Sequence, residues 1–289
     1  MDIGRISTAM VTPFDSKGNI DFSKTTKLIN YLIDNGSDSL VVSGTTGESP
    51  TLTTEEKVAL FKHVVKIVDG RVPVIAGTGS NNTKASIELT KKAEEIGVDA
   101  IMIVTPYYNK PSQEGIIQHF KAISEATRLP ILAYNVPGRT VVRMNAETVI
   151  ELSKIPNVFA IKDAGGDLNE MSRIIEETPD DFLLYSGDDG VTLPVLSIGG
   201  AGVISVASHV IGNSMQEMIS LFLNGKNDQA AKLHRRLLPL MNELFKAPSP
   251  APVKTALQMK GLDVGGVRMP LLPLNEAERT SLSKVMQAL

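Results

Sequence analysis

The stretch Asn157–Gly166, NVFAIKDAGG, is an apolar, strand-like run that ends in a lysine and a turn of small residues. Lys162 at that end has two interpretations. Its ammonium extends to water along the apolar stem, or it lies in a dry site with a lowered pKa and acts as a nucleophile. In isolation the solvated charge is the favoured interpretation, because most lysines are solvated surface groups. The surrounding chain has to decide between them.

The same kind of short apolar run recurs along the chain, separated by longer amphipathic segments. Strands of four to six continuously apolar residues, each followed by a helix, are typical of a parallel sheet covered on its outer face. Eight such units predict an α/β fold, a closed (β/α)₈ TIM barrel, rather than an open sheet. The predicted strands are Ile6–Val11, Ser39–Ser43, Val74–Gly77, Ala100–Thr105, Ile131–Asn135, Val158–Lys162, Phe182–Ser186 and Gly202–Ser205.

The segments between the strands have helical periodicity and local start signals. Thr53 with Glu56 fits a capping box, and Ser112 and Asn145 suit helix entry. The predicted helices are Phe22–Ile33, Glu55–Val68, Ile87–Ile96, Glu114–Ala126, Ala146–Leu152, Leu168–Glu176, Val191–Ile198 and Ser214–Leu223.

The alternation stops after Asn224, which predicts a barrel over residues 1–224 and a helical extension over residues 225–289. In the extension, Asp228–Phe245, Pro252–Met259 and Asn275–Leu289 are predicted helices. It contains no obvious chemistry, so its expected role is packing or oligomer contact.

Composition excludes several classes of function. A net charge of −3 gives no electrostatic reason to expect nucleic acid or an anionic membrane as a partner. The chain has no cysteine, and its four histidines lack paired ligand spacing, so no metal or other cofactor is expected. The uncharged run 190–216 is broken by Pro194 and by four glycines besides its first residue, Gly190, which favours buried barrel elements over a membrane span. The N-terminus lacks a signal-like core, which predicts a cytoplasmic location.

In such a barrel the active site lies at the C-terminal ends of the strands. The residues there are rich in hydroxyls and include one lysine, Lys162, which fits carbonyl chemistry through an imine better than metal-assisted chemistry. A lysine at its reference pKa of about 10.4 is almost wholly protonated at pH 7, so an imine-forming lysine needs a dry setting. Alternation puts Ala160 and Lys162 on one face of the strand, a candidate for the barrel interior.

Three other strand-end features are candidates for the site. The turn Gly44–Glu48, GTTGE, offers hydroxyls and backbone donors for a carboxylate, or it is simply a turn before the next helix. Tyr134 is a candidate proton relay or a packed residue. Arg139 can bind a second carboxylate bidentately or remain a solvated loop residue.

Two glycine-rich stretches resemble phosphate-binding signals. In GTGSNN, residues 77–82, Asn82 occupies the place of the third glycine of GxGxxG, so the signal is weak. SIGGAG, residues 197–202, precedes the eighth strand, where barrels often bind phosphate. A phosphorylated substrate is therefore an alternative, although tight packing explains these glycines more simply.

Several long motifs follow one another along the chain: GTTGE, TPYYNKPSQEG of Thr105–Gly115, YNVPGRT of Tyr134–Thr140, IKDA of Ile161–Ala164, SGDD of Ser186–Asp189, GGAGVISV of Gly199–Val206 and APSPAPVKTAL of Ala247–Leu257. In this order they resemble the 4-hydroxy-tetrahydrodipicolinate synthases, also called dihydrodipicolinate synthases, of the pyruvate-dependent class I aldolases. The resemblance runs almost end to end.

The resemblance implies a TIM barrel that condenses pyruvate with L-aspartate 4-semialdehyde on the diaminopimelate route to L-lysine. It assigns the pyruvate imine to Lys162 and proton transfer to Tyr134. Thr45 would link Tyr134 to Tyr108 of a neighbouring subunit, in a homotetramer built from dimers. The substrate-binding positions it implies are Thr46 with Thr45 for the pyruvate carboxylate, Arg139 for the semialdehyde carboxylate, and Gly187 and Ile204 through their backbone.

The departures from the family pattern bear on regulation. Asp163 replaces a frequent glutamate, a conservative change. Lysine-inhibited members tend to carry His, His and Glu at the positions of Thr54, Lys57 and Ala85, whereas Ser49, Asn81 and Tyr107 still match that site. Weak or absent feedback inhibition by L-lysine is therefore expected.

Two alternatives stay open. N-acetylneuraminate lyases and 2-keto-3-deoxy sugar-acid aldolases share the lysine, the tyrosine and GxTGE, and only Arg139 with the Tyr107–Tyr108 pair favours the synthase. A non-catalytic barrel that binds keto acids is the remaining alternative, disfavoured by the presence of Lys162, Tyr134 and Thr45.

Overall fold

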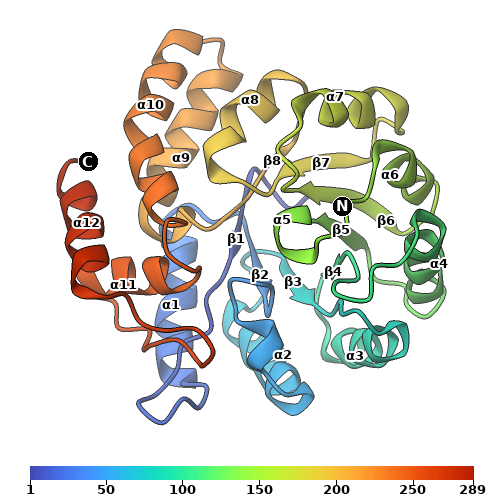
Figure 1. Ribbon diagram of the computed structural model, residues 1–289, viewed down its shortest axis with the longest axis horizontal. Coiled ribbons are helices and arrows are strands. Elements are labelled where there is room, and N and C mark those ends of the chain that lie inside the picture. The colour runs from blue at the N-terminus through green and yellow to red at the C-terminus, as the bar shows by residue number, and fades with distance from the viewer.

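Eight parallel strands form a closed barrel in the computed structural model, which describes residues 1–289 (Figure 1). The strands follow one another in chain order, and the barrel closes where β1 pairs with β8, with Ile6 opposite Val203. The predicted fold class is confirmed. The strands are β1 Ile6–Ala9, β2 Ser39–Val42, β3 Val74–Gly77, β4 Ala100–Val104, β5 Ile131–Asn135, β6 Val158–Asp163, β7 Leu183–Ser186 and β8 Gly202–Ser205.

The strands are mostly apolar because they are buried on both faces, although they also carry buried polar residues such as Ser7, Thr8 and Lys162. Inward-facing side chains such as Met102, Leu132 and Tyr185 fill the barrel in a cluster of 13 buried residues. A separate cluster of 55 buried residues, Ile101 and Ile161 among them, lies largely between the strands and the surrounding helices. The alternation along each strand therefore assigns successive residues to two different cores.

Helices form the outer ring, and their predicted start signals are present. Thr53 and Glu56 form the capping box at α2, and Ser112 and Asn145 cap α4 and α6. None of the helices is long and apolar enough to cross a membrane. The ring consists of α1 Phe22–Asp34, α2 Thr54–Val68, α3 Thr83–Ile96, α4 Gln113–Ser124, α6 Ala146–Ser153, α7 Leu168–Glu177, α8 Thr192–Ser197 and α9 Ser208–Leu223.

Three differences from the predicted elements have local causes. Helix α3 begins at Thr83 because the Asn82 side chain caps it, although its first turn is polar. Helix α9 begins at Ser208 and continues across a kink at Ile211, next to Gly212. An unpredicted single turn, α5 Pro137–Thr140, lies over the barrel in Figure 1. One turn is too short to show helical periodicity in the sequence.

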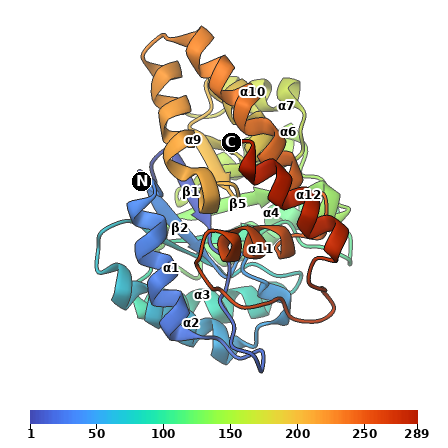
Figure 2. The same ribbon diagram turned by 90° about the vertical axis from the view of Figure 1, so that its left-hand side faces the viewer.

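The C-terminal extension, residues 225–289, packs on one side of the barrel (Figure 2). It contains α10 Asn227–Glu243, α11 Ala251–Met259 and α12 Glu276–Gln287. Helix α10 packs on α9 and α12, and α11 packs on α9 and α12. The three predicted helices are confirmed, whereas the domain boundary at residue 224 stays a prediction.

Candidate active site

Lys162 lies at the end of β6 with its side chain directed into the barrel. It is only 5% exposed, and it is paired in register with Tyr134 of β5 and Tyr185 of β7. Its Nζ lies 4.3 Å from the centre of the Tyr134 ring. The lysine is therefore a buried group beside an aromatic side chain, and the interpretation as a solvated surface charge is wrong.

Burial changes the acidity of this lysine. Because its charged form loses hydration, the pKa of Lys162 falls to about 8. The negative charge of Asp189 acts in the opposite direction, and the Arg139 guanidinium adds to the lowering. A larger fraction of the amine is consequently neutral near pH 7 than for a lysine in water, as nucleophilic attack requires.

Tyr134 is the neighbour of Lys162 and is itself buried. Burial raises the pKa of its phenol, while Arg139 and a hydrogen bond with Thr45 counteract part of this effect. The phenol therefore keeps its proton at neutral pH. The structure brings Tyr134, Thr45 and Lys162 together, as the site prediction requires.

The turn Gly44–Glu48 follows β2 and is held by the backbone. The Glu48 N–H donates to the Thr45 carbonyl at 3.0 Å, and the Thr12 hydroxyl donates to the Gly47 carbonyl at 2.7 Å. Thr46 is buried, whereas Thr45 is half-buried. Because the helix α2 has its own cap at Thr53, the turn is not needed for that purpose.

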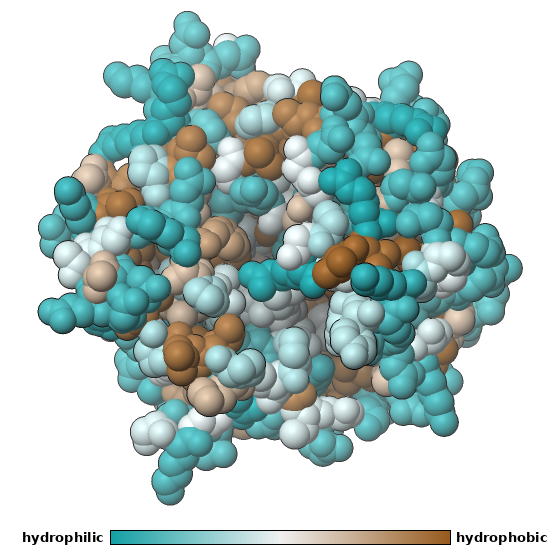
Figure 3. Space-filling model, in the orientation of Figure 1, coloured by the Kyte–Doolittle hydropathy of each residue, from teal (hydrophilic) through white to brown (hydrophobic).

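A cavity of about 270 Å³ opens at this end of the barrel. Thr45, Tyr134 and Arg139 line it together, and Arg139 extends from the short helix α5. Figure 3 shows the surface hollowed near the centre of this face, within a mostly hydrophilic rim. Lys162 is not among the lining residues, but its Nζ lies against the ring of Tyr134, and Tyr134 lines the cavity.

The remaining predicted residues fall into two groups. Gly187 lies beside the lysine, because a Cβ added there would be 3.1 Å from Lys162 Cε and 2.8 Å from Ala164 Cβ. Ile204 belongs to the same inner cluster as Tyr134. Tyr108, in contrast, is 88% exposed and does not line the cavity. A single chain therefore does not bring Tyr108 to the site.

One residue near the lysine was not predicted. Asp189 is buried, and its Oδ2 accepts hydrogen bonds from the backbone N–H groups of Val206 and Ala207 at 3.1 and 2.8 Å. It stands in the SGDD motif three residues after a strand ends, which was the available signal. Burial raises its own pKa, and its charge favours the protonated form of Lys162.

The glycines of SIGGAG are explained by packing. A Cβ on Gly200 would lie 2.3 Å from Val195 Cγ1, and one on Gly202 would lie 2.1 Å from the Arg5 carbonyl oxygen. Any larger residue would push the eighth strand away from its neighbours. Close packing therefore accounts for this stretch without a phosphate.

Comparison with known proteins agrees with this geometry. The model of the dihydrodipicolinate synthetase family matches residues 2–289. The chain belongs to this family. A 4-hydroxy-tetrahydrodipicolinate synthase from Bacillus velezensis is 68% identical over 289 residues, and one from Bacillus subtilis is 66% identical over 290, each covering 100% of both chains.

A solved structure gives the same result for the fold. The crystal structure of a dihydrodipicolinate synthase from Bacillus anthracis superimposes with a TM-score of 0.99 at 67% identity, covering 100% of this chain and 99% of that one. The predicted family and its activity, that of a 4-hydroxy-tetrahydrodipicolinate synthase and a lyase of the class I aldolase type, are confirmed.

Proposed function

We propose that this family member condenses pyruvate with L-aspartate 4-semialdehyde through an imine on Lys162, in the diaminopimelate route to L-lysine. The observation that carries the mechanism is Lys162 itself, a buried amine 4.3 Å from the ring centre of Tyr134 beneath a cavity at the strand ends. The names of the full-length relatives support the synthase over N-acetylneuraminate or sugar-acid lyases.

The first half of the reaction activates pyruvate. The neutral Lys162 amine attacks the keto carbon and forms a C–N bond, which gives a carbinolamine. Its hydroxyl leaves as water when it receives a proton, and the buried Tyr134 phenol, which keeps its proton because burial raises its pKa, supplies it. The Tyr134 phenolate left by this donation takes a methyl proton from the resulting imine, which restores the phenol and gives an enamine.

The second half forms the ring. The enamine carbon attacks the aldehyde carbon of the semialdehyde, whose oxygen takes up a proton and becomes the hydroxyl of the product. The amino group of the semialdehyde then attacks the imine carbon and displaces Lys162. One water is released overall, and the lysine returns to its starting state.

The carboxylates of the two substrates need separate partners. We assign the pyruvate carboxylate to Thr45 and Thr46 on the turn after β2, and the semialdehyde carboxylate to Arg139 at the cavity rim. Gly187 and Ile204 would line the pocket through their backbone. Close contact with Lys162 is compatible only with glycine at position 187.

The exposed Tyr108 supports an oligomeric enzyme. Tyr108 is 88% exposed, which supports contact with a second copy, in which it would reach Thr45. We propose a homotetramer of paired dimers, and a fully active monomer in sedimentation analysis would exclude it. A cytoplasmic location stays a prediction.

Trapping of the imine tests the mechanism. Borohydride reduction in the presence of pyruvate is expected to attach the reduced three-carbon unit to Lys162, found by peptide mapping. Omission of pyruvate is the control and should leave the peptide unmodified. Failure to find the adduct on Lys162 would refute the imine mechanism.

Weak feedback by L-lysine is a second expected property. Ser49, Lys57 and Tyr107 line the same cavity as Tyr134, so any ligand there would meet the Lys57 amine. Cationic Lys57 repels the ammonium groups of L-lysine at short range. A loss of about 1.4 kcal/mol of binding free energy already lowers the affinity for L-lysine tenfold. We therefore expect half-inhibition in steady-state assays only above about 1 mM. Inhibition at submillimolar lysine would contradict this expectation.

A further inference from the structure

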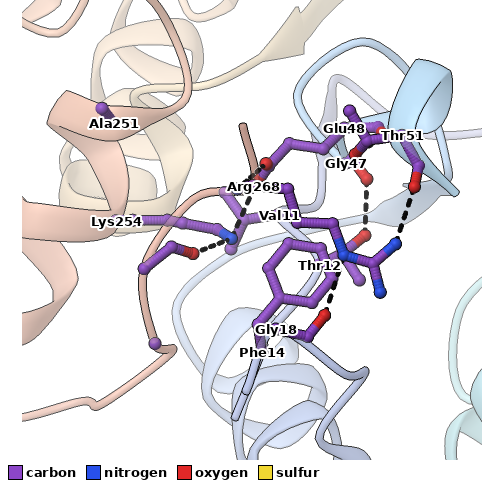
Figure 4. Close-up of polar contacts among 12 residues, drawn as sticks. Val11, Thr12, Phe14, Gly18, Gly47, Glu48, Thr51, Ala251, Lys254 and Arg268 are labelled. Carbon is purple, nitrogen blue, oxygen red and sulfur yellow. Dashed lines mark hydrogen bonds and ion pairs between the residues drawn. The ribbon is translucent and has the colours of Figure 1, made fainter. Parts of the chain in front are cut away.

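A buried ion pair joins the active-site turn to the C-terminal extension (Figure 4). Glu48, the last residue of GTTGE, contacts Lys254 of α11, with Oε1 and Nζ 2.6 Å apart. Their side chains are only 1% and 2% exposed. We propose that Glu48 and Lys254 are positioning residues that hold Thr45 and Thr46 at the pyruvate carboxylate, so that the extension forms part of the active site.

Glu48 is held on the turn side of this pair. Its backbone has a φ of 57°, a left-handed conformation that L-residues adopt at a cost, and its N–H donates to the Thr45 carbonyl at 3.0 Å. Its second carboxylate oxygen, Oε2, accepts from the Arg268 backbone N–H at 2.8 Å. Both ends of the residue are therefore fixed, one to Thr45 and the other to the extension.

Lys254 is held equally firmly on the extension side. Its Nζ also donates to the Gly266 carbonyl at 2.7 Å and lies 4.2 Å from the centre of the Phe14 ring. Lys254 itself lies on α11, and these two partners come from the loop after α11 and from the segment after β1. The lysine thus fixes Glu48 relative to three parts of the chain at once.

Arg268 extends the same network along the turn. Its guanidinium donates to the carbonyls of Gly18 and Thr51 at 2.8 and 2.7 Å and pairs with the carboxylate of Glu56 on α2. The Arg268 Cζ lies 4.5 Å from the centre of the Phe14 ring. Figure 4 shows the Lys254 ammonium and the Arg268 guanidinium on the two sides of the Phe14 ring, with Glu48 above them.

The chemistry of the pair argues for positioning rather than simple packing. A well-packed apolar pair would stabilise the fold at least as well, because burying two charges costs hydration. An ion pair with hydrogen bonds is directional, so it specifies the position of the Glu48 carboxylate. Because Glu48 and Thr45 are three residues apart on one turn, a fixed Glu48 also restricts the positions of the substrate-binding hydroxyls.

The positioning role rests on the proposed function, and it predicts different effects on the binding of the two substrates. Glu48 and Lys254 act through Thr45 and Thr46, which we assign to pyruvate, whereas Arg139 lies on a separate element, α5. Loss of the pair should therefore weaken pyruvate binding selectively. Loss of global stability would lower the amount of folded enzyme without this selectivity.

Lys254→Met tests the proposal, because methionine keeps most of the apolar stem and removes the charge. We expect the KM for pyruvate to rise about tenfold while the KM for the semialdehyde changes less than about twofold. The matched control is Lys246→Met, which removes an exposed lysine paired with Glu243 in the same extension and should change neither value. Unchanged pyruvate KM in folded Lys254→Met enzyme, or a parallel rise in both KM values, overturns the proposal.

Glu48→Gln covers the case in which Lys254→Met does not fold. The amide keeps the shape of Glu48 and can still accept from Lys254, so a smaller rise of about threefold in pyruvate KM is expected. No change overturns the proposal. Borohydride trapping in the wild type separates the positioning role of Glu48 and Lys254 from the proposed function. An adduct on Lys162, together with an unchanged pyruvate KM in the variants, rejects only the positioning role. A missing adduct rejects the proposed function.

Discussion

Replacement of Lys162 by alanine is expected to lower kcat by about 10⁴-fold or more, because the imine with pyruvate no longer forms. The side chain is buried and makes no hydrogen bond that a neighbour depends on, so the barrel should still fold. Steady-state condensation of pyruvate with L-aspartate 4-semialdehyde measures the loss. Circular dichroism checks the fold.

The pH dependence of the wild type gives the same assignment independently. Because burial lowers the pKa of Lys162 to about 8, the neutral fraction of the amine rises with pH, reaches one half near that value and levels off above it. The value of kcat/KM for pyruvate should rise by about tenfold per pH unit well below pH 8 and level off above it. The alanine variant should lack this rise.

A surface lysine provides the control for this substitution. Lys154 pairs with Glu151 on the outside of the barrel and is largely exposed. Lys154→Ala should keep kcat within about twofold of the wild type, since surface ion pairs contribute little. Should Lys162→Ala retain more than a tenth of the wild-type kcat, the imine mechanism is wrong.

Replacement of Tyr134 by phenylalanine is expected to lower kcat by about 10²- to 10⁴-fold, the usual contribution of a positioned proton donor. The ring remains against Lys162 Nζ, so packing is retained, and only the hydroxyl that bonds with Thr45 is lost. Single-turnover formation of the pyruvate imine, followed by borohydride trapping, measures the affected step.

Tyr185 offers a matched control in the same barrel. Tyr185 is paired in register with Lys162 from β7, the strand next to β6 on the side away from β5. It is as buried as Tyr134. Its hydroxyl, however, donates to the Gly4 carbonyl at 3.1 Å, just before the start of β1. Tyr185→Phe should cost about 1 kcal/mol of stability and leave the rate of imine formation unchanged. Equal losses of rate in both variants would show that Tyr134 acts through packing.

Helix starts illustrate how far local signals extend. Thr53 with Glu56 identifies the start of α2 because capping is a contact between residues three apart. The start of α9 at Ser208 was missed because Gly212 resembles a helix breaker. Its reason is tertiary: a Cβ at this position would lie 2.1 Å from the Asn35 carbonyl oxygen, so only glycine fits against the end of α1.

The candidate site was predictable where it follows from strand order. Lys162 and Tyr134 lie at the ends of adjacent strands, and parallel strands in sequence order place their ends together. Arg139 was predicted as a loop residue, whereas α5 carries it. The contribution of Asp189 required the structure, because the effect of a charge depends on its distance and burial rather than on its motif.

The sequence by itself determined the barrel, since eight apolar strands that alternate with amphipathic helices have few other ways to bury their surfaces. It also determined the family, and it predicted Lys162 as the nucleophile. Only the tertiary structure decided which charges became buried and with which partners. Lys254 and Glu48 lie 206 positions apart, and no local pattern distinguishes a lysine that will be 2% exposed from one in water. The same holds for Lys162. Its lowered pKa comes from burial in the closed barrel, and the stretch NVFAIKDAGG that carries it does not set this value by itself.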